Sequence, residues 1–134
     1  MNDESQRIPV STDQDVVRVR QLVRTVAVAV KLSLVDQTKL VTAASELARN
    51  TLVYGMGGMV EVSRVHNDRR GGIRIVFADQ GPGIVDLDLA LTDGYTTGGG
   101  LGLGLSGARR LVDEFEIETE PGKGTTVTVV KWCR

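Results

Sequence analysis

Two amphipathic helices are predicted in the first part of the chain. Apolar residues recur there at alternating steps of three and four, which places them on one helical stripe: Val16, Val19, Val23, Val26 and Val30. Thr12 and Asp15 have the spacing of a capping box, in which a hydroxyl caps the helix and a carboxylate follows three residues later. The first helix is therefore expected to begin directly after Thr12.

The second helix is predicted to run from Ser33 to about Tyr54. Ser33 and Asp36 repeat the capping spacing. Small and aliphatic residues form the apolar side of this segment: Leu40, Ala43, Ala44, Leu47 and Ala48. A glycine cluster that begins at Gly55 then ends the helical pattern.

The period of the pattern changes to two in the rest of the chain. The segments Met59–His66 and Ile73–Ala78 are predicted to be strands joined by a turn, and Arg7–Ser11 is predicted as a short first strand. A third helix is expected over Leu101–Asp113. After it, alternating glutamate and apolar residues predict a strand to Glu120, and a turn leads to a last strand, Thr125–Trp132.

This order of elements predicts an α+β fold. Hairpins separated by helices favour a two-layer sandwich, in which a mostly antiparallel sheet has three helices on one face. The length of 134 residues is that of one domain, so residues 1–134 are predicted to form a single domain.

Composition excludes several classes of protein. Sixteen basic against 17 acidic residues, with only five aromatic residues, make binding of DNA or RNA unexpected. The single cysteine excludes an internal disulfide and indicates a reducing compartment. The N-terminal segment is polar and acidic, and no apolar run approaches about 18 residues, so the sequence predicts a cytoplasmic protein without a membrane segment.

Three polar residues on the second predicted helix are candidates for chemistry. Glu46, Asn50 and Tyr54 are spaced four residues apart and share one helical face. A carboxylate and a carboxamide one turn apart could hold Mg²⁺ and orient a hydroxyl, because Mg²⁺ takes oxygen ligands. The alternative is an ordinary solvated polar face.

Asp79 is the second candidate, at the end of a hydrophobic strand. Gly81 and Gly83 follow at once, and glycine lets the backbone lie close against a ligand. A carboxylate at this position could accept a hydrogen bond from an amino group with high selectivity. The alternative is a simple Asp/Gly turn. The hydroxyl of Thr125, after another glycine turn, matters only if it faces the same pocket.

A glycine-rich segment, Thr96–Gly107, is the third candidate. It contains G-x-G-x-x-G, but Tyr95-Thr96-Thr97 precedes it in place of a strand and no parallel crossover follows, as dinucleotide binding would require, and the P-loop pattern also fails. What remains is a glycine run that opens a helix and offers backbone N–H groups to an anion. Residues 79–108 contain no Lys or Arg, so bound phosphates would depend on backbone amides, a helix terminus and a metal.

The order of these motifs resembles the GHKL ATP-binding family. E-L-A-R-N on a helix, D-Q-G-P-G-I after a strand, T-T-G-G-G-L-G-L-G-L before a helix, and G-T before the last strand occur in that family's order. A freestanding chain of this length is most similar to the group of anti-sigma-factor serine/threonine kinases. The resemblance therefore implies a protein serine/threonine kinase with ATP and Mg²⁺ as cofactors.

The resemblance also implies a role for each matched residue. Glu46 would be the general base, Asn50 would ligate Mg²⁺, and Asp79 would accept the adenine amino group. The nucleotide-binding residues implied by the resemblance are Asn50, Asp79, Gly81, Gly83, Thr97, Gly98, Gly100, Leu101, Gly102, Leu103, Gly104 and Thr125. Gly100 stands where sporulation relatives carry an arginine near the γ-phosphate, so the charge usually supplied there is missing.

The partners implied by the resemblance are proteins. STAS-domain scaffold and antagonist proteins of a stressosome would be the substrates, and a PP2C-type phosphatase would be a second partner. Glu46 favours a kinase. The alternative is a nucleotide-gated binding or anti-sigma module that transfers little or no phosphate.

Overall fold

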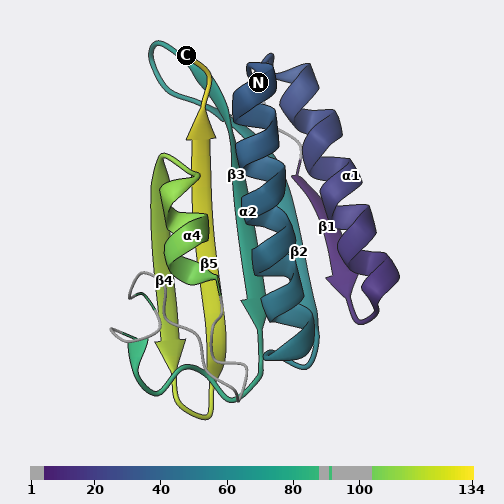
Figure 1. The fold of residues 1–134 in the computed structure, drawn as a ribbon, viewed down its shortest axis with the longest axis vertical. Helices are drawn as coiled ribbons and strands as arrows, with labels where there is room; N and C mark the ends of the chain where they lie inside the picture. The colour runs from purple at the N-terminus through teal and green to yellow at the C-terminus, as the bar shows by residue number, and fades with distance from the viewer. Residues whose placement is uncertain (1–4, 88–90, 92–103) are drawn as a thin grey trace.

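A computed structural model describes residues 5–87, 91 and 104–134. Five strands form one sheet in the order β1-β2-β3-β5-β4, and each neighbouring pair is antiparallel. The strands are β1 (Ser5–Val10), β2 (Gly58–His66), β3 (Gly71–Asp79), β4 (Glu114–Glu120) and β5 (Gly124–Trp132). The helices α1 (Asp13–Ala29), α2 (Leu34–Val53) and α4 (Leu105–Arg110) lie on one face of the sheet (Figure 1). The predicted α+β sandwich is confirmed.

The core lies between the helices and this face of the sheet. The predicted stripe of α1 is buried at Val16, Val19, Val23 and Val26, and all five predicted apolar positions of α2 are buried. The sheet contributes alternate residues of its central strands, such as Ile73, Ile75, Phe77, Val127 and Val129. The periods of about 3.6 and two therefore identified the two sides of the core correctly.

The predicted caps hold both long helices at their N-termini. Thr12 and Asp15 form a complete capping box on α1, and the Ser33 side chain accepts a hydrogen bond from the Asp36 N–H at 3.1 Å on α2. The backbone N–H of Ser11 donates to Asp15 at 2.9 Å and is the main cause that lowers the pKa of the Asp15 carboxyl. The stabilisation from this carboxylate is therefore present at neutral pH and is lost as acid protonates it.

One predicted boundary is wrong. The third helix was expected to reach Asp113, but α4 ends at Arg110, and Leu111 is its C-cap. The Asp113 N–H donates instead to the carbonyl of Val130 at 2.9 Å, so tertiary hydrogen bonding to β5 ends the helical path. The first residues of that predicted helix, 101–103, lie outside the described part of the chain.

The second face of the sheet has no helix over it in Figure 1. On β4, which is an edge strand, Glu114, Glu116, Glu118 and Glu120 are exposed and alternate with half-buried residues. A shallow polar depression includes Glu116 and Glu118 together with Arg74 of β3. In the described residues, no helix is long and apolar enough to cross a membrane.

Candidate nucleotide site

A pocket lies between α2, the start of α4 and one end of strands β3 and β5. Four of the residues predicted for nucleotide binding line it: Asn50, Asp79, Gly83 and Thr125. Tyr54, which shares the helical face of Asn50, is also in the lining. Apolar walls come from Leu47, Phe77, Ile84, Leu105 and Val127. The enclosed volume is about 40 Å³, which is room for a few water molecules. Apolar walls with a few convergent polar groups are typical of small-molecule sites.

Asp79 is fixed by its place in the sheet and by two backbone donors. It ends β3 between Gly58 of β2 and Thr125 of β5. Its Oδ1 accepts hydrogen bonds from the N–H of Gly81 at 2.9 Å and the N–H of Thr125 at 3.2 Å. The carboxylate is therefore oriented before any ligand arrives, and its half-buried side chain lies in the pocket lining.

Glycines allow the backbone to close around this carboxylate. A Cβ atom on Gly55 would overlap Cβ and Cγ of Asp79, and a Cβ on Gly81 would lie 2.7 Å from Cα of Gly55. Gly124 has φ +103°, and a Cβ there would overlap the carbonyl oxygen of Asp79. Any larger residue would therefore displace Asp79 or the backbone beside it. The sequence prediction included Gly81 but treated Gly55 only as the end of a helix.

The hydroxyl of Thr125 is held by a residue that the sequence prediction missed. The Oγ1 atoms of Thr119 on β4 and Thr125 on β5 are 2.8 Å apart. Thr119 Oγ1 also accepts from the N–H of Ile84 at 2.9 Å, which ties the segment after Asp79 to β4. A signal was present in the sequence. Phe115 and Ile117 make the inward positions of β4 apolar, and Thr119 puts a hydroxyl at the next inward position.

Glu46 lies on α2, one helical turn before Asn50, and its side chain is beside the start of α4. Glu46 is exposed and is not part of the pocket lining itself. Gly104, the N-cap of α4 with φ 68°, packs so closely against it that a Cβ there would overlap Oε2 of Glu46. Leu105, the next residue, lines the pocket. The structure therefore places Glu46 at the edge of the pocket, on α2 where this helix meets the start of α4.

The remaining predicted residues fall outside the described part of the chain. These are Thr97, Gly98, Gly100, Leu101, Gly102 and Leu103. Arg49, which precedes the pocket residue Asn50 in the chain, makes an ion pair with Asp13 of α1 at 3.6 Å.

The described residues offer polar groups suited to the base of a nucleotide and to one metal ligand. A carboxylate held by backbone N–H groups and surrounded by glycines suits the flat edge of a base, and the carboxamide of Asn50 carries an oxygen of the kind that Mg²⁺ takes as a ligand. Within residues 5–87, 91 and 104–134, no cluster of three or more His, Cys, Asp or Glu could hold a metal ion. A magnesium ion here would therefore take most of its ligands from phosphates and water, as it does in other phosphate sites.

Comparison with known proteins gives consistent matches. Residues 35–133 match the family of histidine kinase-, DNA gyrase B- and HSP90-like ATPases. The chain is 42% identical to the serine/threonine-protein kinase RsbT of Bacillus subtilis over 134 residues, which is 100% of both proteins. It is 32% identical to the anti-sigma F factor of Thermoanaerobacter pseudethanolicus over 95 residues, which is 68% of this chain and 66% of that factor.

A solved structure agrees with the fold. The crystal structure of the RsbU and RsbW domains of a Mycobacterium tuberculosis protein matches with a TM-score of 0.59 and 21% identity. The match covers 96% of this chain but only 31% of that larger chain, so it supports the architecture alone.

Proposed function

The chain belongs to the family of histidine kinase-, DNA gyrase B- and HSP90-like ATPases and is a serine/threonine protein kinase; from this premise we propose its substrates and mechanism. It phosphorylates STAS-domain regulatory proteins with Mg-ATP in a partner-switching stress response. Residues 1–134 act as one kinase domain in the cytoplasm. When released from the STAS protein, the kinase binds a PP2C-type phosphatase.

The observation that carries the mechanism is the placement of Glu46, Asn50 and Asp79. Asp79 and Asn50 line one pocket from β3 and α2, and Glu46 lies one turn from Asn50 beside the start of α4. A nucleotide with its base at Asp79 and its phosphates toward Asn50 would therefore bring the γ-phosphate toward Glu46.

At the base end, Asp79 accepts a hydrogen bond from the adenine amino group. The N–H groups of Gly81 and Thr125 hold its carboxylate in place, so little reorganisation is needed on binding. Thr125 supports the same end through its hydroxyl, which Thr119 orients. Gly81 and Gly83 let the segment after Asp79 pack closely on its neighbours, because a Cβ on Gly81 would lie 2.7 Å from Cα of Gly55 and one on Gly83 would overlap the carbonyl oxygen of Glu120.

At the phosphate end, Asn50 would hold Mg²⁺ through its side-chain oxygen. The metal supplies charge neutralisation to the phosphates when it is bound. Gly104 and the predicted residues Thr97, Gly98, Gly100, Leu101, Gly102 and Leu103 would supply backbone N–H groups to the phosphates, and of these Gly104 alone is in the described part of the chain. Because residues 79–108 contain no Lys or Arg, this segment offers no side-chain cation to the γ-phosphate.

Glu46 is the general base of the transfer. Its carboxylate accepts the proton of the substrate serine hydroxyl as the serine oxygen bonds to the γ-phosphorus. The bond between that phosphorus and the bridging oxygen breaks, and ADP leaves. The exposure of Glu46 suits this role, because a serine on another protein must reach it.

One observation favours the second candidate function, a nucleotide-gated binding module with little phosphotransfer. The absence of Lys and Arg between Asp79 and Ala108, including the arginine position at Gly100, leaves the γ-phosphate with less stabilisation than in relatives that carry this arginine. The two functions differ in whether labelled phosphate reaches the partner.

Phosphotransfer from γ-labelled ATP to a STAS-domain protein, followed by phosphosite mapping, tests the proposal. Asn50→Ala and Asp79→Ala are expected to lose ATP binding. Glu46→Gln should bind ATP normally but transfer phosphate about 10²–10⁴-fold more slowly. Glu116→Gln, at an exposed glutamate of β4, is the control and should behave as wild type. Labelled histidine, or no label on any partner, would contradict the kinase proposal, and normal transfer by Glu46→Gln would remove the general base.

A further inference from the structure

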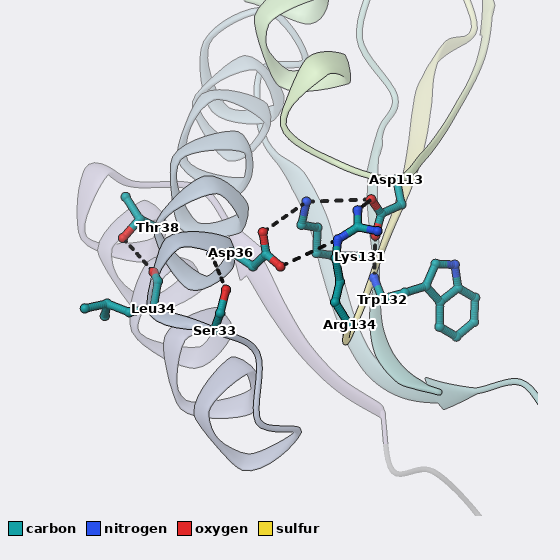
Figure 2. Close-up of polar contacts among 8 residues, drawn as sticks. All are labelled: Ser33, Leu34, Asp36, Thr38, Asp113, Lys131, Trp132 and Arg134. Carbon is teal, nitrogen blue, oxygen red and sulfur yellow. Dashed lines mark hydrogen bonds and ion pairs between the residues drawn. The ribbon is translucent and has the colours of Figure 1, made fainter. Parts of the chain in front are cut away.

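Four charged side chains meet at the first turn of α2, away from the pocket. Lys131 of β5 lies between two carboxylates, with Nζ 3.6 Å from Oδ1 of Asp36 and 3.7 Å from Oδ1 of Asp113 (Figure 2). Arg134 contacts the same two, with Nε 3.9 Å from Oδ2 of Asp36 and Nη2 hydrogen-bonded to Oδ1 of Asp113 at 2.6 Å. The charges of two cations and two carboxylates therefore balance in this cluster.

Lys131 is the buried member of this cluster. Its side chain is 4% exposed, against 61% for Arg134. A buried ammonium is costly unless carboxylates compensate it, and here two of them do. The long distances to both show that Lys131 acts as a shared charge between Asp36 and Asp113 and not as half of one close pair.

One of the two carboxylates is in α2, and the other is in the segment that leads from α4 to β4. Asp36 is in the first turn of α2, which later carries Glu46 and Asn50. Asp113 follows the end of α4, and β5 fixes it twice: its N–H donates to Val130 O at 2.9 Å, and its Oδ2 accepts from the N–H of Trp132 at 2.7 Å. Lys131 therefore connects the start of α2 to the exit from α4.

The helices α2 and α4 meet at the candidate site. Gly104, at the start of α4, packs against the carboxylate of Glu46. Ten residues of helix separate Asp36 from Glu46, which is about 15 Å. The two helices are in contact at Glu46, and at the charge cluster Lys131 links the first turn of α2 to Asp113, beyond the end of α4. A displacement at the charge cluster is therefore expected to change the spacing at Glu46.

We propose that Lys131 is a positioning residue: it holds the start of α2 and the exit from α4 against β5, and so fixes Glu46 relative to the start of α4. This inference rests on the proposed kinase function for its catalytic consequence only. The structural part, that Lys131 orders α4, is independent of that function.

Lys131→Met tests this role, because methionine fills a similar space without charge. Phosphotransfer kcat should fall by about tenfold or more, as expected for a displaced catalytic group, while KM for ATP stays near wild type. Lys131→Arg should restore most of kcat. Lys39→Met, at an exposed lysine of α2, is the matched control and should change neither constant.

Hydrogen exchange gives a readout that does not need activity. The N–H of Ala108 donates to Gly104 O at 2.9 Å, and that of Leu111 to Ala108 O at 3.0 Å. Both amides should exchange faster in Lys131→Met than in Lys39→Met, and Lys131→Arg should restore their protection. Unchanged exchange at both amides would overturn the inference, whatever the kinase assay shows. If wild type transfers no phosphate, the proposed function fails, and exchange alone decides the role of Lys131.

A charge-balanced double variant separates positioning from stability. Lys131→Met with Asp113→Asn removes one charge of each sign and leaves Arg134 with Asp36, which limits the destabilisation. Recovered stability with low kcat and fast exchange in α4 supports the inference. Recovered stability with normal kcat and normal exchange overturns it, because the lysine would then only offset a buried carboxylate.

Discussion

Ion pairs hold the first turn of α2 in place. The last turn of α2 lies beside the pocket, where glycines allow the backbone to pack against Asp79. At the first turn, Asp36 faces Lys131 and Arg134, and Asp113 completes the cluster. After the last turn, Gly55 packs directly on Asp79, and the backbone of Gly81 and Thr125 holds that carboxylate. The two ends of α2 therefore lie beside two different carboxylates: Asp36, which cations neutralise, and Asp79 of β3, which backbone N–H groups hold.

The difference shows how the fold can offer an acidic group to a ligand. Asp36 is compensated by its neighbours and has little to offer a new partner. In the described part of the chain, Asp79 accepts from backbone N–H groups, which orient a carboxylate without neutralising its charge. The cluster can therefore stabilise the helix, whereas the pocket retains a negative group for a ligand donor. Substitutions at the two ends of α2 should therefore differ in their effects. At the pocket, stability should depend on side-chain volume, and at the charge cluster it should depend on side-chain charge.

The largest effect is expected at Gly55. Gly55→Ala should lower the free energy of unfolding by about 3 kcal/mol, because the added Cβ overlaps the Asp79 side chain and both backbones must shift. Displacement of Asp79 should also weaken ATP binding by about tenfold or more. Denaturant unfolding and nucleotide titration measure the two effects.

Gly107→Ala is the control for this substitution. Among the described residues, a Cβ at Gly107 meets nothing within 4 Å, and Gly107 is exposed within α4. Alanine there should stabilise the protein by about 0.5–1 kcal/mol through its higher helix propensity. Equal effects at the two glycines would show that close packing on Asp79 is unimportant.

Asp36→Asn tests the charged end and should have a smaller effect. It keeps the shape of the side chain but leaves Lys131 with Asp113 as its remaining carboxylate in the cluster. The expected loss is about 2 kcal/mol, because one partner of a buried charge is removed. Unfolding at low and high salt should give similar losses, since buried charges are screened little.

Asp68→Asn, in the exposed turn between β2 and β3, is the matched control and should be near neutral. A loss at Asp36 that disappears in high salt would indicate that the cluster behaves as a solvated surface pair. The contrast between the two ends of α2 would then fail.

The smallest effect is expected at Thr119. Thr119→Val removes the acceptor of the Ile84 N–H and the hydroxyl that contacts Thr125, and should cost about 1 kcal/mol. ATP affinity should fall modestly, because Thr125 loses its orientation. Thr128→Val, on the helix-free face of β5, gives the comparison. Calorimetry with and without nucleotide separates the two effects, and identical results for both variants would exclude a role for Thr119 in the pocket.

The helices and strands could be predicted because their signals are local. The spacing of Val16 to Val26 and the caps at Thr12 and Ser33 act within one or two turns. The end of α4 could not be predicted in this way. Asp113 leaves the helical path because Val130 and Trp132, far along the chain, offer it hydrogen bonds.

The residues of the candidate site also differ in whether local sequence signals could identify them. Asn50 and Asp79 could be predicted because each carries an unusual group at a conspicuous place, inside a helix or before paired glycines. Gly55 could not, because its partner is set by the packing of α2 on the end of β3, and at Thr119 only the inward hydroxyl was visible, since its partner Thr125 is set by strand register. The cluster of Lys131 was missed for the same reason, since its members are distant in sequence.

The glutamates of β4 have a consequence for how copies of the chain meet. An edge strand carries unpaired backbone donors and acceptors along one side, which can act as a template for aggregation. Four exposed carboxylates follow this edge from Glu114 to Glu120. A second copy approaching edge to edge would bring the same four charges, and their repulsion opposes the growth of a continuous intermolecular sheet.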